Sequence, residues 1–116
     1  MELLVYKASA GSGKTFTLAV EYIKLLILNP RAYRQILAVT FTNKATAEMK
    51  ERILSQLYGI WKGDKDSDAY LKRIIVETGK PVEEVREAAK VALTNMLHDY
   101  SRFRVETIDS FFQSVM

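Results

Sequence analysis

Short apolar runs alternate along the chain with segments in which apolar residues recur every three or four positions. The run at 3–6 is rich in strand-forming residues and predicts a buried strand. A loop with two glycines follows at 8–13, and apolar residues then recur with helical spacing over 16–27. We expect this helix to end at Asn29–Pro30, because proline cannot continue a helix and disfavours helical backbone in the residue before it.

The same alternation continues in the middle of the chain. The apolar run at 36–39 predicts a second buried strand, and the polar residues at 40–43 predict a turn. Asn43 is a suitable N-cap for a helix that begins at Lys44 and runs to about Tyr58, with apolar residues at four-residue steps. The signals that mark its end are Gly59, Gly63 and Asp64.

The last third of the chain is predicted to be helical before a final strand and a final helix. A helical segment over 68–77 is broken by a Gly-Lys-Pro sequence, whose Pro81 suits the first turn of the next helix. Residues 103–108 alternate between apolar and polar, which predicts a strand, and Asp109 is expected to cap a helix over 110–116. Because strands and helices alternate, the order predicts an α/β fold with short parallel strands and flanking helices.

Composition narrows the class of protein but not its function. The 116 residues are enough for one small domain, and 48% hydrophobic with 27% charged residues is the mixture of an ordinary globular protein. The absence of cysteine excludes a disulfide framework and a cysteine-based zinc site. Apolar runs are too short for a signal peptide or a membrane span, so we expect a cytoplasmic protein without a membrane partner. The net charge of +3 permits an anionic partner without requiring one.

The strongest chemical signal is a phosphate-binding pattern between the first predicted strand and the first predicted helix. It matches G-x-x-x-x-G-K-[ST] at every position but the first and reads Ala8-Ser9-Ala10-Gly11-Ser12-Gly13-Lys14-Thr15. Glycines let the backbone amides turn toward phosphate oxygens, and the helix N-terminus favours the same anion.

Two side chains of this pattern carry the expected chemistry. Lys14 can reach the β- and γ-phosphates, and the Thr15 hydroxyl can bind Mg²⁺, so these are the candidate catalytic residues. We expect ATP and Mg²⁺ to bind at residues 8–16, with Phe16 as the last contact. The plainer alternative is a glycine-rich turn with an exposed lysine.

Two further segments resemble motifs of one helicase family. Residues 36–49, ILAVTFTNKATAEM, closely resemble motif Ia of the UvrD/Rep/RecB superfamily 1 DNA helicases. Residues 107–112, TIDSFF, resemble the next DNA-contacting motif of that family, with Asp109 at a position where the family commonly has histidine. The three motifs span nearly the whole chain, and the long helical segment before Thr107 is more similar to the RecB/AddA branch.

The resemblance implies a fold, an activity and a set of partners. It implies an incomplete RecA-like P-loop NTPase domain over 1–116, with a helical insert at about 64–100, as the N-terminal fragment of an ATP-dependent DNA helicase of recombination or repair. It also implies a path for single-stranded DNA across the domain. The candidate DNA contacts are Thr40, Phe41, Thr42, Asn43, Lys44, Thr107, Asp109 and Ser110.

Two of these residues have competing interpretations. Phe41 at a loop tip offers a face for base stacking, whereas the alternative is an ordinary core aromatic. Lys44 either faces a phosphate or is only solvated.

Parts of the family's machinery have no counterpart in the sequence. No apolar strand ends in the Asp-Glu pair that would hold Mg²⁺ and activate water, and the second motor domain that supplies arginines is absent. We therefore expect nucleotide binding with negligible hydrolysis and no unwinding from this chain alone. The alternatives are another P-loop NTPase or kinase, and a nucleotide- or DNA-binding module without catalysis.

The rest of the helicase implied by the resemblance would also affect which strands are neighbours in the sheet. Later strands would normally flank the first strand of a RecA-like core, so the three strands present need not be neighbours. Exposed edges of such a sheet would favour self-association of the chain.

Overall fold

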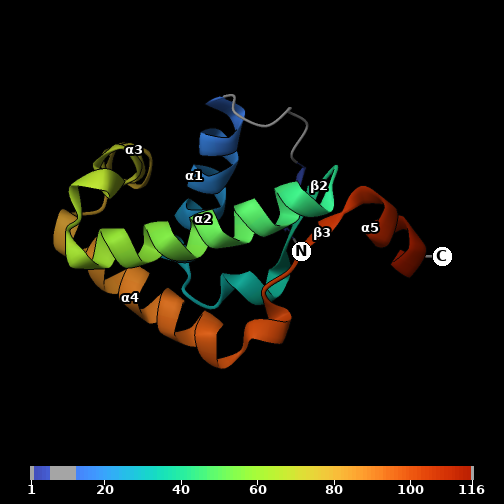
Figure 1. The fold of residues 1–116 in the computed structure, drawn as a ribbon. Helices are drawn as coiled ribbons and strands as arrows, with labels where there is room; N and C mark the ends of the chain where they lie inside the picture. Colours follow the sequence, from blue (N-terminus) through green and yellow to red (C-terminus); the bar gives the residue numbers. More distant parts are fainter. Residues whose placement is uncertain (1, 6–12, 116) are drawn as a thin grey trace.

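The computed structural model describes residues 2–5 and 13–115 of the chain, and the side chains of residues 16–113. It is mostly helical, with a short parallel sheet toward one end (Figure 1). This arrangement agrees with the prediction of short parallel strands with flanking helices. In chain order the elements are β1 (Glu2–Val5), α1 (Gly13–Leu28), the 3₁₀ turn η1 (Ala32–Gln35), β2 (Ile36–Thr40), α2 (Asn43–Lys62), η2 (Lys65–Ser67), α3 (Asp68–Thr78), α4 (Val82–His98), η3 (Tyr100–Arg102), β3 (Val105–Thr107) and α5 (Ile108–Val115).

The three strands lie side by side in the order β1–β2–β3, and both pairs are parallel. Leu4 of β1 pairs with Ala38 of β2, and Ala38 pairs in turn with Val105 of β3. This corrects the expectation that the strands need not be neighbours, because each strand pairs directly with the next. β2 is the central strand, and all five of its residues are buried, as its uninterrupted apolar run predicts.

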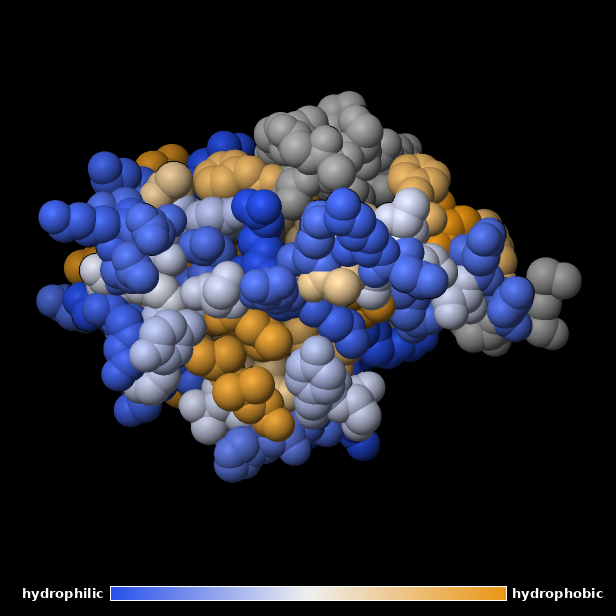
Figure 2. All heavy atoms as spheres, viewed as in Figure 1, coloured by the Kyte–Doolittle hydropathy of each residue, from blue (hydrophilic) through white to orange (hydrophobic). Residues whose placement is uncertain are grey.

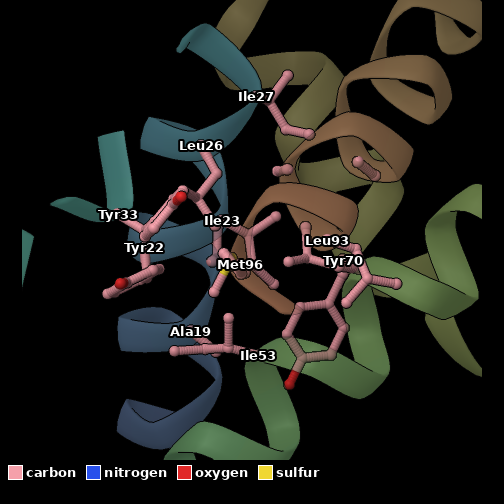
Figure 3. Packing of buried hydrophobic residues seen from close by; sticks show 14 of the residues in the cluster. Ala19, Tyr22, Ile23, Leu26, Ile27, Tyr33, Ile53, Tyr70, Leu93 and Met96 are labelled. Carbon is pink, nitrogen blue, oxygen red and sulfur yellow. The ribbon is translucent and has the colours of Figure 1, made fainter. Parts of the chain in front are cut away.

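The hydrophobic core lies where α1, α2 and α4 pack together, with α3 closing one side (Figure 3). α1 buries the face on which apolar residues recur at helical spacing, and it ends at Leu28, just before Asn29–Pro30, as predicted. The core residues that meet in Figure 3 are Ala19, Ile23, Leu26 and Ile27 of α1, Ile53 of α2, Tyr70 of α3, and Leu93 and Met96 of α4.

The N-terminus of α2 is capped by a different residue from the one predicted. The Thr42 hydroxyl accepts a hydrogen bond from the Ala45 amide at 3.0 Å, which makes Thr42 the N-cap and Asn43 the first helical residue. Thr42 has the extended backbone that an N-cap adopts. Both residues are good caps by type, so composition alone could not separate them.

The C-terminus of α2 also lies beyond its predicted position. The helix continues past Tyr58 to Lys62, and Gly63 ends it in the left-handed conformation with φ of 74°. Gly59 lies inside the helix and is buried, where a Cβ would come within 1.9 Å of the Ser67 Oγ atom. Gly59 therefore allows close packing against η2 and is not a stop signal.

The two helices after η2 lie close to their predicted positions. α3 spans the predicted segment with one residue more, and Gly79 ends it with φ of 70°. Pro81 is the N-cap of α4 rather than a residue of its first turn. The long buried face of α4 packs along α2, so the insert covers the same core as the first two helices (Figure 1).

The last strand is shorter than predicted, because a helix begins earlier. β3 covers only Val105–Thr107, and α5 starts at Ile108. The Thr107 hydroxyl accepts a hydrogen bond from the Ser110 amide at 3.2 Å, so Thr107 takes the capping role predicted for Asp109. Asp109 lies instead in the first turn of α5, where its negative charge favours the helix N-terminus.

The surface is mainly polar on the face drawn in Figure 2. Hydrophilic residues cover most of this face, and a hydrophobic patch lies between α2 and α4. Within residues 2–5 and 13–115, no helix combines the length and the apolar composition that crossing a membrane requires.

Candidate functional site

The candidate site lies where all three parallel strands end. Carboxyl ends of parallel strands meet at one edge of a sheet, and open α/β sheets bind ligands beyond that edge. β1 ends at Val5 and leads into the phosphate-binding pattern, while β2 and β3 lead into the two segments predicted to contact DNA. The fold therefore brings the two segments predicted to contact DNA to one edge of the sheet, the same edge at which β1 ends.

The phosphate-binding pattern is described only in part. The predicted contacts Ala8, Ser9, Ala10, Gly11 and Ser12 lie outside the described residues. Gly13 begins α1, and the backbone of Lys14 and Thr15 forms the first turn of this helix. The side chains of Lys14 and Thr15 are not among those described, so their predicted roles stay predictions.

A polar hollow of about 360 Å³ joins the two predicted DNA segments. One wall comes from the loop after β2 and the start of α2, and the other comes from the end of β3 and the start of α5. These segments are more than sixty residues apart in the chain and meet because β2 and β3 are neighbours. The lining residues are Phe41, Thr42, Asn43, Thr107, Asp109, Ser110 and Gln113.

Phe41 is the large apolar side chain of this hollow. It is 56% exposed, so its interpretation as a core aromatic is wrong. Large aromatic side chains are usually buried, and an exposed ring beside polar groups can offer a flat face to a planar ligand.

Thr40 lies next to the hollow but does not line it. Its side chain is completely buried, and its hydroxyl lies 2.6 Å from the Thr46 hydroxyl and 3.2 Å from the Thr42 carbonyl oxygen, to which it donates. This placement corrects the expectation that Thr40 contacts DNA, because its polar atom is used within the protein. Thr40 instead holds the loop that carries Phe41.

The charge of the hollow is carried by Asp109, which is exposed in the first turn of α5. Among the described residues, no lysine or arginine lines it. Lys44 follows the lining residue Asn43 and is exposed. Its exposure is compatible both with contact to a nearby phosphate and with simple solvation. The other lining groups are hydroxyls and amides, which donate and accept without net charge.

Gln113 is the lining residue that the sequence interpretation missed. It lies one helical turn after Asp109 on α5, so both side chains emerge on the same face of that helix. Four-residue spacing from Asp109 could have identified it. The motif resemblance covers residues 107–112 and ends one residue before Gln113.

Phe16, the last predicted nucleotide contact, is held by the helical insert. Its ring packs against Tyr70 of α3 with 4.6 Å between the centroids. The Tyr70 hydroxyl accepts a hydrogen bond from Arg52 Nη1 of α2 at 3.0 Å. Phe16 is therefore partly buried and serves as a packing residue at the start of α1.

Comparison with known proteins decides the family. The model of the UvrD/REP helicase N-terminal domain matches residues 2–116. The chain belongs to this family. RecB, a subunit of the RecBCD enzyme, is 33% identical in Buchnera aphidicola over 121 residues, which cover 95% of this chain and 10% of the relative. No solved structure matches the chain significantly.

Other UvrD/REP relatives match shorter stretches more closely. RecB of Escherichia coli is 43% identical over 60 residues, which cover 45% of this chain and 5% of the relative. DNA helicase II of Haemophilus influenzae is 44% identical over 71 residues, which cover 54% of this chain and 10% of the relative. The chain thus spans a tenth or less of the length of these relatives. The resemblance to the UvrD/Rep/RecB family is confirmed.

Proposed function

We propose that this chain is the ATP-binding and DNA-contacting N-terminal part of an ATP-dependent DNA helicase that acts in recombination or repair. The observation that carries the proposal is the meeting of the two predicted DNA segments in a single polar hollow, at the sheet edge where β1 also ends. A RecA-like motor arranges its nucleotide and its single-stranded DNA path around such an edge. The named helicases among the relatives support the same class of activity.

The nucleotide half of the proposal rests on the strand–loop–helix order. α1 begins at Gly13, eight residues after β1 ends at Val5, and its first-turn amides and positive dipole end favour an anion at its N-terminus. This setting fits a triphosphate, with Lys14 toward the terminal phosphates and Thr15 toward the metal. The Thr15 hydroxyl would hold Mg²⁺, which would supply positive charge to offset that of the phosphates.

The DNA half rests on the composition of the hollow. Phe41 would stack on a base, while Thr42, Asn43, Ser110 and the neighbouring Lys44 would meet the sugar–phosphate backbone. Asp109 would disfavour a phosphate directly beside it, so the backbone would pass on the Asn43 side.

Hydrolysis would require an acid pair that activates water, and we expect this chain to lack it, because no apolar run of the printed sequence ends in Asp-Glu. We therefore expect the isolated chain to bind nucleotide and single-stranded DNA without appreciable turnover.

Two titrations test the two halves separately. Lys14→Ala should weaken binding of ATP–Mg²⁺ and leave the affinity for an oligothymidylate unchanged. Phe41→Ala should weaken oligothymidylate binding by about five- to a hundredfold, the loss of about 1–3 kcal/mol of stacking. Tyr58→Ala is the matched control, since Tyr58 is 52% exposed on α2 outside the hollow. Equal losses from Phe41→Ala and Tyr58→Ala would refute the assignment of the hollow.

A further inference from the structure

Phe16, in the first turn of α1, makes an aromatic contact with Tyr70 of α3. Phe16 follows Thr15 directly, and its ring tilts 54° against the ring of Tyr70 at 4.6 Å between centroids. Tyr70 is only 4% exposed, so its ring is enclosed by its neighbours and has little freedom to move. The insert thus contacts the chain at the point where the phosphate-binding pattern becomes a helix.

A second contact fixes the orientation of the Tyr70 ring. Arg52 Nη1 donates to the Tyr70 hydroxyl at 3.0 Å, and Arg52 belongs to α2. The side chain of Tyr70 therefore joins three helices: its own α3, the start of α1 and the middle of α2. A nearly buried tyrosine with a bonded hydroxyl is a rigid support, because the bond holds the end of the side chain and close packing holds the ring.

We propose that Tyr70 is a positioning residue for the nucleotide site. The first turn of a helix has amides without intrahelical partners and frays easily, so its geometry depends on side-chain packing. Tyr70 fixes Phe16 and through it the turn that carries Lys14 and Thr15. This inference rests on the proposed function, since it assigns the insert a role in binding the triphosphate.

Three variants separate this role from a general contribution to folding. Tyr70→Leu removes the ring, and Tyr70→Phe keeps the ring but loses the bond from Arg52. Ile74→Ala is the matched control, because Ile74 is completely buried one turn further along α3 and makes no ring contact with Phe16. Affinities for ATP–Mg²⁺ and for inorganic triphosphate are measured by calorimetry at a temperature at which all variants are folded by circular dichroism.

We expect Tyr70→Leu to weaken both ligands by the same factor, about three- to tenfold, as expected from loss of one aromatic pair. Tyr70→Phe should retain most of the affinity, and Ile74→Ala should bind both ligands as the parent chain does. The inference is overturned if Ile74→Ala weakens binding as much as Tyr70→Leu, if Tyr70→Leu has no effect, or if only ATP binding weakens, which would place Tyr70 at the base.

Measuring Lys14→Ala in the same experiment separates a failure of the proposed nucleotide site from a failure of the role proposed for Tyr70. If Lys14→Ala leaves triphosphate binding unchanged, the proposed nucleotide site is wrong and this inference is lost with it. If Lys14→Ala weakens binding and Tyr70→Leu does not, the nucleotide site stands and Tyr70 is only a core residue.

Discussion

Two buried tyrosines on neighbouring elements make a matched test of how hydroxyl groups affect the stability of this core. Tyr22 of α1 is fully buried, and its hydroxyl has no hydrogen-bond partner in the described part of the chain. Tyr33 of η1 is almost as buried, but its hydroxyl donates to Asp99 Oδ2 at 3.0 Å and lies 3.3 Å from the Asn95 carbonyl oxygen. Figure 3 shows both rings beside the same turns of α1.

The two Tyr→Phe substitutions should therefore change stability in opposite directions. Burying a hydroxyl without a partner costs about 1–3 kcal/mol, while the Tyr22 ring keeps its edge contact with Phe103 at 5.7 Å after substitution. Tyr22→Phe should raise the free energy of unfolding by about 1 kcal/mol. Tyr33→Phe should lower it by about 1.5 kcal/mol, because the lost hydrogen bond ends on a carboxylate.

Alkaline pH provides a second, independent readout of Tyr22. Burial raises the pKa of its hydroxyl well above the ordinary value of 10.0. Above pH ~10 the unfolded chain loses this proton while the folded chain keeps it, so the stability is complete below that pH and is lost as pH rises toward the folded pKa. The loss reaches about 1.4 kcal/mol per pH unit, and Tyr22→Phe removes it.

Urea unfolding followed by circular dichroism at neutral and alkaline pH measures both effects. The stability advantage of Tyr22→Phe over the parent chain should widen once the pH exceeds ~10. A Tyr22→Phe variant that is less stable than the parent at neutral pH would show that the hydroxyl is satisfied, and the reasoning from burial would then fail.

Two further perturbations test the capping and the glycine assignments. Thr42→Ala should destabilise the chain by about 1 kcal/mol, measured by urea unfolding, because the Ala45 amide loses its cap; an unchanged midpoint would contradict the cap. Gly59→Ala should destabilise it more than Gly79→Ala in thermal melts, since a Cβ at Gly59 would clash with Ser67 at 1.9 Å whereas the left-handed Gly79 has open space around it and costs only about 1 kcal/mol. The reverse order would show that backbone strain outweighs close packing here.

The helices and the central strand could be predicted because their signals are local. The apolar spacing of α1 and the run of β2 each contain the information for their own element, and Pro30 adds a local stop, because continuing the helix through it would cost about 3 kcal/mol. Gly59 shows where this reasoning fails. Gly59 lies inside α2 because Ser67 packs against it, and this contact with a residue beyond the helix cannot be read from the sequence.

Most of the residues that line the hollow could be predicted, but Gln113 and the shape of the hollow could not. Motif resemblance brought Phe41 and Thr107 into one hypothesis, yet only the pairing of β2 with β3 places them in one hollow. The sequence could not show that Thr40 does not line the hollow, because a hydroxyl residue beside a binding loop can form hydrogen bonds either with a ligand or with the loop itself. Its burial, which decides between these roles, depends on strands distant in sequence.

Each wall of the hollow contains a helix that is capped by a threonine, and this shared feature explains the position of the negatively charged Asp109. Thr42 follows β2 and Thr107 is the last residue of β3, and each caps the helix that comes next. The first turns of both helices therefore border the same hollow. Because Thr107 is the cap, Asp109 lies in the first turn of α5. There its negative charge interacts favourably with the positive end of the helix dipole, and its carboxylate lines the hollow. If the hollow contacts DNA as proposed, its affinity then comes from stacking on Phe41 and from uncharged donors. Such contacts release few counterions, so we expect the salt dependence of binding to come from Lys44 beside the hollow and from other surfaces.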